Sequence, residues 1–116
     1  RFGALVPTRA RRVIIAGGIN DAAEDEDAVA RAAEATYRNA VDQGSEVVVI
    51  GPSLAPAVDE RRVRAVDGVL SRAAAAAGVR YVSALDWSVE IGADDLHPTP
   101  DGARTYAGLA RVALGL

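Results

Sequence analysis

Short apolar runs alternate along this chain with longer segments in which apolar residues recur at helical spacing. A continuous apolar run at residues 13–16, and the segment at residues 46–50 that is apolar after Glu46, are each followed by glycine. Such runs are typical of parallel strands that are buried on both faces. A shorter run at residues 79–82 predicts a third strand, followed by a long loop over residues 84–98.

A helix is predicted after each of these strands. Acidic residues at 24–27 precede the first helix, where negative charge favours the positive end of the helix dipole. Asp59 is expected to cap the second helix, and Thr99 the third, which has Pro100 in its first turn. The apolar positions that the helical period places on the inner faces are Val29, Ala32, Ala33, Thr36, Tyr37, Ala40 and Val41 in the first helix, Val63, Val66, Leu70, Ala73 and Ala77 in the second, and Ala103, Tyr106, Ala107, Ala110 and Leu114 in the third.

Strands that alternate with helices at this spacing imply right-handed crossovers and a parallel sheet. We therefore expect a three-layer α/β fold that forms one domain over residues 1–116. Functional sites in such folds lie in loops beyond the carboxyl ends of the strands. Two polar clusters, at residues 18–21 and 94–97, fall in loops of this kind.

Composition and charge argue against several classes of function for this protein. A formal net charge of -3 leaves no basic surface for nucleic acid, which is therefore not an expected partner. The chain has no cysteine, which excludes disulfides and thiolate chemistry, and a single histidine, which argues against a classical zinc site. We expect neither a metal nor a cofactor. No apolar run is long enough to cross a bilayer.

The single histidine, His97, lies three residues after Asp94 in a turn closed by Pro98. A carboxylate at this spacing can orient one ring nitrogen while the other nitrogen faces a substrate. Asp95 is the fallback partner. The alternative is a loop histidine bonded to a backbone carbonyl in a solvated acidic turn. The pattern thus supplies two members of a Ser-His-Asp triad without a serine.

A second polar block, Gly18-Ile19-Asn20-Asp21, follows the first strand. By itself it is compatible with plain turn chemistry. Combined with Asp94-x-x-His97 and the Pro-Thr-Pro-x-Gly run at residues 98–102, in this order, it resembles the SGNH/GDSL hydrolase superfamily. The similarity covers nearly the whole chain.

The resemblance implies a flavodoxin-like fold and hydrolysis of a small-molecule or carbohydrate acyl ester. His97 would be the general base, and Asp94 would orient and support it. Asn20 would donate its side-chain amide to the oxyanion of the tetrahedral intermediate. Gly18 would let the backbone approach the substrate, and Asp21 would hold the loop.

The sequence departs from that superfamily in one respect. The Gly-Asp-Ser block that carries the nucleophile there, and a further block with an oxyanion-hole glycine, are not found in these 116 residues. We therefore expect the chain to be the C-terminal part of a larger hydrolase domain, contributing three strands and their helices. A missing N-terminal segment or a partner chain would cover the open sheet edge.

Several alternatives stay open at this stage. Ser53 is the best internal candidate for a nucleophile, but it lacks the trailing glycine of a nucleophile elbow, and a turn role after Pro52 is the simpler interpretation. Trp87 either lines a substrate pocket or anchors the long loop. An O-acyltransferase that uses the same site, and a noncatalytic or assembly module that retained the fold, are the rival functions.

Overall fold

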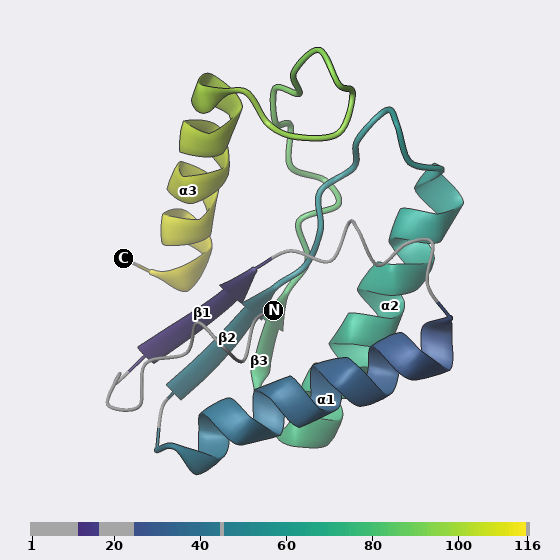
Figure 1. Cartoon of the computed structure of the whole chain (residues 1–116). Helices are drawn as coiled ribbons and strands as arrows, with labels where there is room; N and C mark the ends of the chain where they lie inside the picture. Colours follow the sequence, from purple (N-terminus) through teal and green to yellow (C-terminus); the bar gives the residue numbers. More distant parts are fainter. Residues whose placement is uncertain (1–11, 17–24, 45, 116) are drawn as a thin grey trace.

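The computed structural model describes residues 12–16, 25–44 and 46–115. In these residues six elements alternate: β1 (Arg12–Ala16), α1 (Glu26–Asp42), β2 (Glu46–Ile50), α2 (Glu60–Ala77), β3 (Arg80–Val82) and α3 (Pro100–Leu114) (Figure 1). The three strands are parallel and form one sheet in the order β1-β2-β3. The predicted α/β class with a parallel sheet is confirmed.

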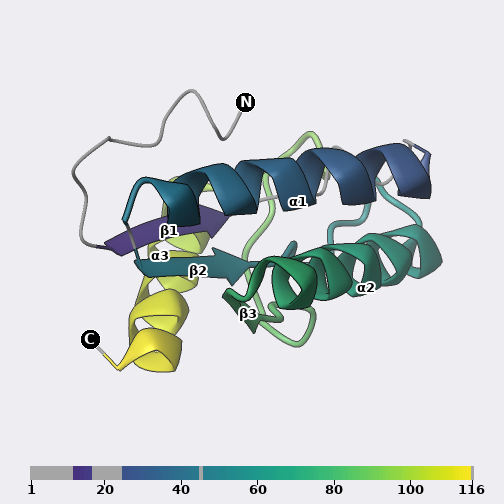
Figure 2. The same ribbon diagram turned by 90° about the horizontal axis from the view of Figure 1, so that it is seen from below.

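The helices cover both faces of the sheet. Figure 2 shows α1 and α2 lying side by side along the sheet, with α3 on the opposite side. Alternate strand residues decide this arrangement, because successive side chains point to opposite faces. Val47 and Val49 pack in one core cluster with α1 and α2, whereas Val48 and Ile50 pack with Leu114 of α3. The result is the expected three-layer architecture.

The first strand is less enclosed than the sequence predicts. All four residues from Val47 to Ile50 are buried, as expected of a central strand. In β1, however, Ile14 is 45% exposed while Val13 and Ile15 are buried. The prediction of a strand buried on both faces is wrong for β1, because the described core on the α3 side of the sheet packs against β2 and does not include Ile14.

Side-chain caps begin all three helices. Asp25 accepts a hydrogen bond from the N–H of Ala28, and Asp59 accepts one from the N–H of Arg61. The Thr99 hydroxyl accepts a hydrogen bond from the N–H of Gly102, with Pro100 in the first turn as expected. These bonds satisfy N–H groups that have no partner inside a helix. The predicted caps Asp59 and Thr99 are confirmed.

The inner faces of α1 and α3 are narrower than the sequence period predicts. In α3, Ala103 and Ala107 are exposed, and Leu114, Tyr106 and Ala110 make the packing against the sheet side. In α1, Val41 is exposed, as is Ala32. A helix buries only the stripe that meets a neighbouring element, so small apolar residues at its margin remain in solvent.

The third strand also begins one residue later than predicted. The N–H of Val79 donates to the carbonyl of Ala74 at 2.9 Å and so completes the end of α2 at the left-handed Gly78. Val79 therefore belongs to the helix stop, and pairing with β2 starts at Arg80.

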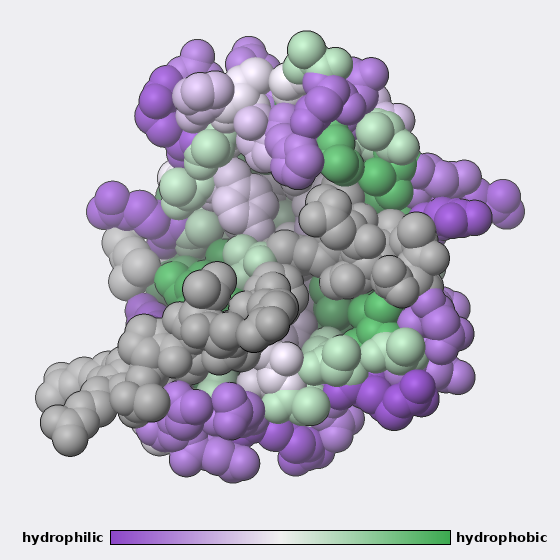
Figure 3. Space-filling view, in the orientation of Figure 1, coloured by the Kyte–Doolittle hydropathy of each residue, from purple (hydrophilic) through white to green (hydrophobic). Residues whose placement is uncertain are grey.

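The surface follows from this layering. Figure 3 shows hydrophilic residues around the rim of one face and hydrophobic residues towards its middle. None of the helices in residues 25–44 and 46–115 is long and apolar enough to cross a membrane.

Candidate active site

His97 and Asp94 form a hydrogen-bonded pair in the turn before α3. The ring Nδ1 of His97 lies 2.7 Å from Oδ2 of Asp94. The other carboxylate oxygen, Oδ1, accepts hydrogen bonds from the backbone N–H groups of Leu96 and His97 at 3.0 and 2.9 Å. The hydrogen bond from the His97 ring, followed by these two backbone bonds, lowers the pKa of Asp94 to about 2.

This arrangement assigns the roles of the two ring nitrogens. A carboxylate that is ionised at neutral pH only accepts hydrogen bonds, so Nδ1 of His97 is the donor to Asp94. The neutral ring then carries its lone pair on Nε2. The His97 side chain is 65% exposed, which leaves that nitrogen accessible to a reacting group. In serine triads generally, the acid–base element is an imidazole that a carboxylate orients in this way.

Asp95 is a backbone turn residue and does not pair with the His97 ring. Its φ of 57° lies in the left-handed region, which aspartate tolerates better than most residues. Its N–H donates to the carbonyl of Gly92, and its own carbonyl accepts from the N–H of Ala57 at 2.8 Å. Of the two carboxylates considered from the sequence, the structure pairs Asp94 with His97.

His97 lines a pocket of about 280 Å³ at the carboxyl edge of the sheet. Ala16 at the end of β1, Ser53 in the loop after β2, and Tyr106 of α3 contribute to its walls. No Asp, Glu, Lys or Arg side chain is among the described residues that line it. The remaining lining residues are apolar, and they are Pro52, Leu96, Pro98 and Ala103. The imidazole therefore meets a largely apolar space.

The second predicted block, with Gly18, Asn20 and Asp21, lies outside the described residues. Ala16, the last residue of β1, lines the same pocket as His97. The roles predicted for these three residues stay predictions.

The structure places Ser53 and Trp87, for which the sequence allowed more than one role. Ser53 is half-buried and shares the pocket with His97, so it is the serine of the described residues that lines this site. Trp87 packs edge-on against Tyr106, with ring centroids 5.1 Å apart and planes at 69°. It is not among the lining residues, so it anchors the long loop against α3.

Sequence reasoning missed a contact group that holds the loop after β2. The Tyr81 hydroxyl donates to Asp67 of α2 at 2.7 Å, and burial, followed by this bond, raises the pKa of Tyr81. A Cβ on Gly51 would overlap that hydroxyl, while the hydroxyl of Tyr106 donates to the Gly51 carbonyl at 3.4 Å. Gly51 is thus enclosed from both sides directly before the pocket wall at Ser53. No local sequence pattern signals contacts between such distant residues.

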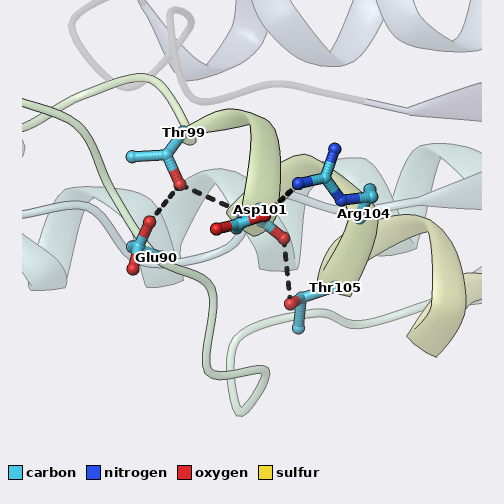
Figure 4. A network of polar contacts seen from close by, with 6 residues as sticks. Glu90, Thr99, Asp101, Arg104 and Thr105 are labelled. Carbon is cyan, nitrogen blue, oxygen red and sulfur yellow. Dashed lines mark hydrogen bonds and ion pairs between the residues drawn. The ribbon is translucent and has the colours of Figure 1, made fainter.

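A second contact group that sequence reasoning missed surrounds the start of α3 (Figure 4). The Thr99 hydroxyl donates to the carboxylate of Glu90, and an isolated antiparallel bridge joins Ile91 to Pro98. On the outer side of the helix, Asp101 forms an exposed ion pair with Arg104. The sequence signals of this junction were the predicted N-cap at Thr99 and the Pro-Thr-Pro-x-Gly run at residues 98–102.

The described residues contain no group of three or more His, Cys, Asp or Glu side chains arranged to hold a metal ion.

A parallel α/β sheet with an oriented His-Asp pair beyond its carboxyl edge is an arrangement found in α/β enzymes that activate a nucleophile. The sequence profile of the GDSL-like Lipase/Acylhydrolase family matches residues 1–105, and the chain belongs to this family. The predicted resemblance is thereby confirmed, and the three parallel strands agree with the flavodoxin-like fold it implies. Membership assigns the chain to hydrolase-type function in the broad sense. Searches of curated proteins and of solved structures gave no match.

Proposed function

We propose that this chain supplies the general base and its supporting carboxylate to a serine-dependent carboxylic ester hydrolase. The observation that carries the proposal is the 2.7 Å contact between Nδ1 of His97 and Asp94, beside an apolar pocket in a chain of the lipase/acylhydrolase family. The pair leaves Nε2 of His97 for proton transfer, which is the function of the base in such hydrolases.

The proposed reaction proceeds in two similar halves. Nε2 of His97 takes the proton of the nucleophilic hydroxyl while the oxygen of that hydroxyl bonds to the acyl carbon of the ester. The tetrahedral intermediate then expels the alcohol, which receives that proton from Nε2, and an acyl-enzyme remains. A water molecule repeats the sequence and releases the acid and the free hydroxyl. Asp94 stays ionised throughout and stabilises the imidazolium. Asn20 donates to the oxyanion.

The nucleophile in this proposal is a serine of a Gly-Asp-Ser block in a segment N-terminal to residues 1–116. Two features support it. The family places its nucleophile in such a block, and β1 pairs with β2 alone in the described sheet, which leaves an edge on which further strands can add. The described residues would then be the C-terminal part of a larger domain. Ser53 is the competing nucleophile, because it lines the pocket together with His97.

The pocket favours a small, uncharged acyl group. Its volume of about 280 Å³ lies just below the roughly 300–1,000 Å³ typical of small-molecule sites. Because no carboxylate or guanidinium is among its described lining residues, a charged acyl group would lose hydration without gaining an ion pair. We therefore propose short acyl esters, including acetylated carbohydrates, as the substrate class.

The decisive experiment labels the protein at its full natural length with a fluorophosphonate, which reacts with activated serines, and locates the label by peptide mass. We expect label on a serine upstream of residue 1 and loss of both labelling and ester hydrolysis in His97→Ala. The Ser53→Ala variant should keep both. Label on Ser53 would transfer the nucleophile to this chain and contradict the upstream assignment. Wild-type hydrolysis by His97→Ala would overturn the proposed base.

A further inference from the structure

The turn that carries His97 is the tip of a short hairpin whose base lies at Glu90 and Thr99. The N–H of Gly92 donates to the carbonyl of His97 at 2.8 Å, and the N–H of Thr99 donates to the carbonyl of Glu90 at 3.1 Å. At the tip, the carbonyl of Asp95 is bonded to the loop after β2. The backbone of His97 is therefore held by the hairpin, which the bond at Asp95 anchors at its tip to the loop after β2.

Side-chain hydrogen bonds join the base of this hairpin to the first turn of α3. Figure 4 shows Glu90 and Thr99 pointing towards each other at this junction. The Thr99 hydroxyl donates to Oε1 of Glu90 and accepts the N–H of Gly102 at 3.0 Å. A Cβ on Gly102 would overlap the carbonyl oxygen of Glu90, so the hairpin backbone lies directly against the helix. One hydroxyl thus joins the hairpin and the helix.

We propose that Glu90 and Thr99 are positioning residues for His97. They act through the hairpin base two residues after the histidine and keep its ring in register with Asp94 and with the pocket. The negative carboxylate of Glu90 is also favourable beside the positive end of the α3 dipole. This inference rests on the proposed role of His97 as base, because positioning matters for turnover only if the ring takes part in the reaction.

The test separates the effect of the bond between Thr99 and Glu90 from the general stability of α3. Glu90→Ala removes the acceptor of the Thr99 hydroxyl but leaves the cap on Gly102, whereas Glu90→Gln keeps an acceptor oxygen of similar reach. Arg104→Gln is the matched control, because it breaks the exposed ion pair with Asp101 at the start of the same helix and leaves the bond between Thr99 and Glu90 in place.

Two measurements are made on each variant. One is the kcat and KM for hydrolysis of an activated acetyl ester by the protein at its natural length. The other is the proton NMR resonance of the His97 Nδ1–H, which reports the bond to Asp94 whether or not a nucleophile is present. We expect Glu90→Ala to lower kcat about tenfold to a hundredfold with KM within about twofold, and to broaden or shift the resonance. Glu90→Gln and Arg104→Gln should resemble the wild type.

The outcomes distinguish this inference from the proposed function. Wild-type kcat together with an unchanged resonance in Glu90→Ala would overturn the positioning role while the base assignment stands. An equal loss of the resonance in Arg104→Gln would also overturn it, because the effect would then reflect the helix end in general. If His97→Ala retains full hydrolysis, the proposed function fails, and the resonance alone decides whether Glu90 positions the ring.

Discussion

One carboxylate oxygen of Asp94 lies 2.7 Å from Nδ1 of His97, and the other accepts two backbone N–H groups of the same turn. The carboxylate therefore orients the imidazole and closes the turn that presents it. Changes at Asp94 should consequently affect both proton transfer and the local backbone.

The titration of Asp94 should depend on His97. The pKa of this carboxyl group is lowered from 3.8 to about 2, first by the hydrogen bond from the His97 ring and then by the backbone bonds. Because the folded value lies below the ordinary one, the stabilisation is present above about pH 4 and is lost as the pH falls through about 2. Carboxyl ¹³C NMR should place the midpoint near 2, and His97→Ala should raise it towards 3.8. The same midpoint in both proteins would contradict the assigned cause. The spectrum of Asp94→Asn identifies the resonance.

Replacement of Asp94 by asparagine should impair turnover far more than replacement of its neighbour. An amide can turn an N–H towards Nδ1 and favour the wrong ring tautomer, so we expect Asp94→Asn to lower kcat by roughly a thousandfold or more. Asp95→Asn is the matched control, because asparagine also tolerates the left-handed φ of 57° and Asp95 contributes backbone bonds. Steady-state kinetics on an activated ester measure both variants. Equal losses would mean that the turn tolerates no change and that Asp94 has no special role.

Gly51 should tolerate no side chain. A Cβ there would overlap the Tyr81 hydroxyl and lie 2.5 Å from a carboxylate oxygen of Asp67. We expect Gly51→Ala to lower the free energy of unfolding by about 1–3 kcal/mol, as measured by urea denaturation. Gly108→Ala is the control, because a Cβ on this helical glycine meets nothing within 4 Å. It should raise the free energy of unfolding by up to about 1 kcal/mol. An unchanged free energy of unfolding in Gly51→Ala would show that Tyr81 and Asp67 move aside at little energetic cost.

The side chain at position 103, on the pocket wall formed by α3, should limit the length of the substrate acyl chain that the pocket accepts. Ala103 lines the pocket, so Ala103→Leu should fill part of it and shift the ratio of kcat/KM for acetyl over hexanoyl esters by about tenfold in favour of acetyl. Ala107 lies one turn further along α3, is exposed and is not among the lining residues. Ala107→Leu should therefore leave the ratio unchanged. A series of p-nitrophenyl esters measures both variants. An unchanged ratio in Ala103→Leu would place the acyl group elsewhere.

The elements of the fold were largely predictable because their signals are local. A helix cap is a hydrogen bond between residues two or three positions apart, as in Asp59 and Thr99, so the sequence alone contains both partners. The buried run of β2 likewise indicates a central strand without further information. The prediction failed where burial depends on neighbours, since Ile14 and Ala107 are apolar yet exposed.

In the candidate site, too, local contacts were predictable from the sequence and long-range contacts were not. The sequence by itself indicated Asp94 as the first candidate partner of His97, because a turn brings residues three positions apart into hydrogen-bond distance, and the structure decided for Asp94 over Asp95. It also indicated that both polar loops follow the carboxyl ends of strands. Only the tertiary structure decided that Ser53, Ala16 and Tyr106 share a pocket with His97, and that Glu90 meets Thr99 at the base of the hairpin. These contacts join segments far apart in the chain, and their geometry depends on how the helices pack against the sheet.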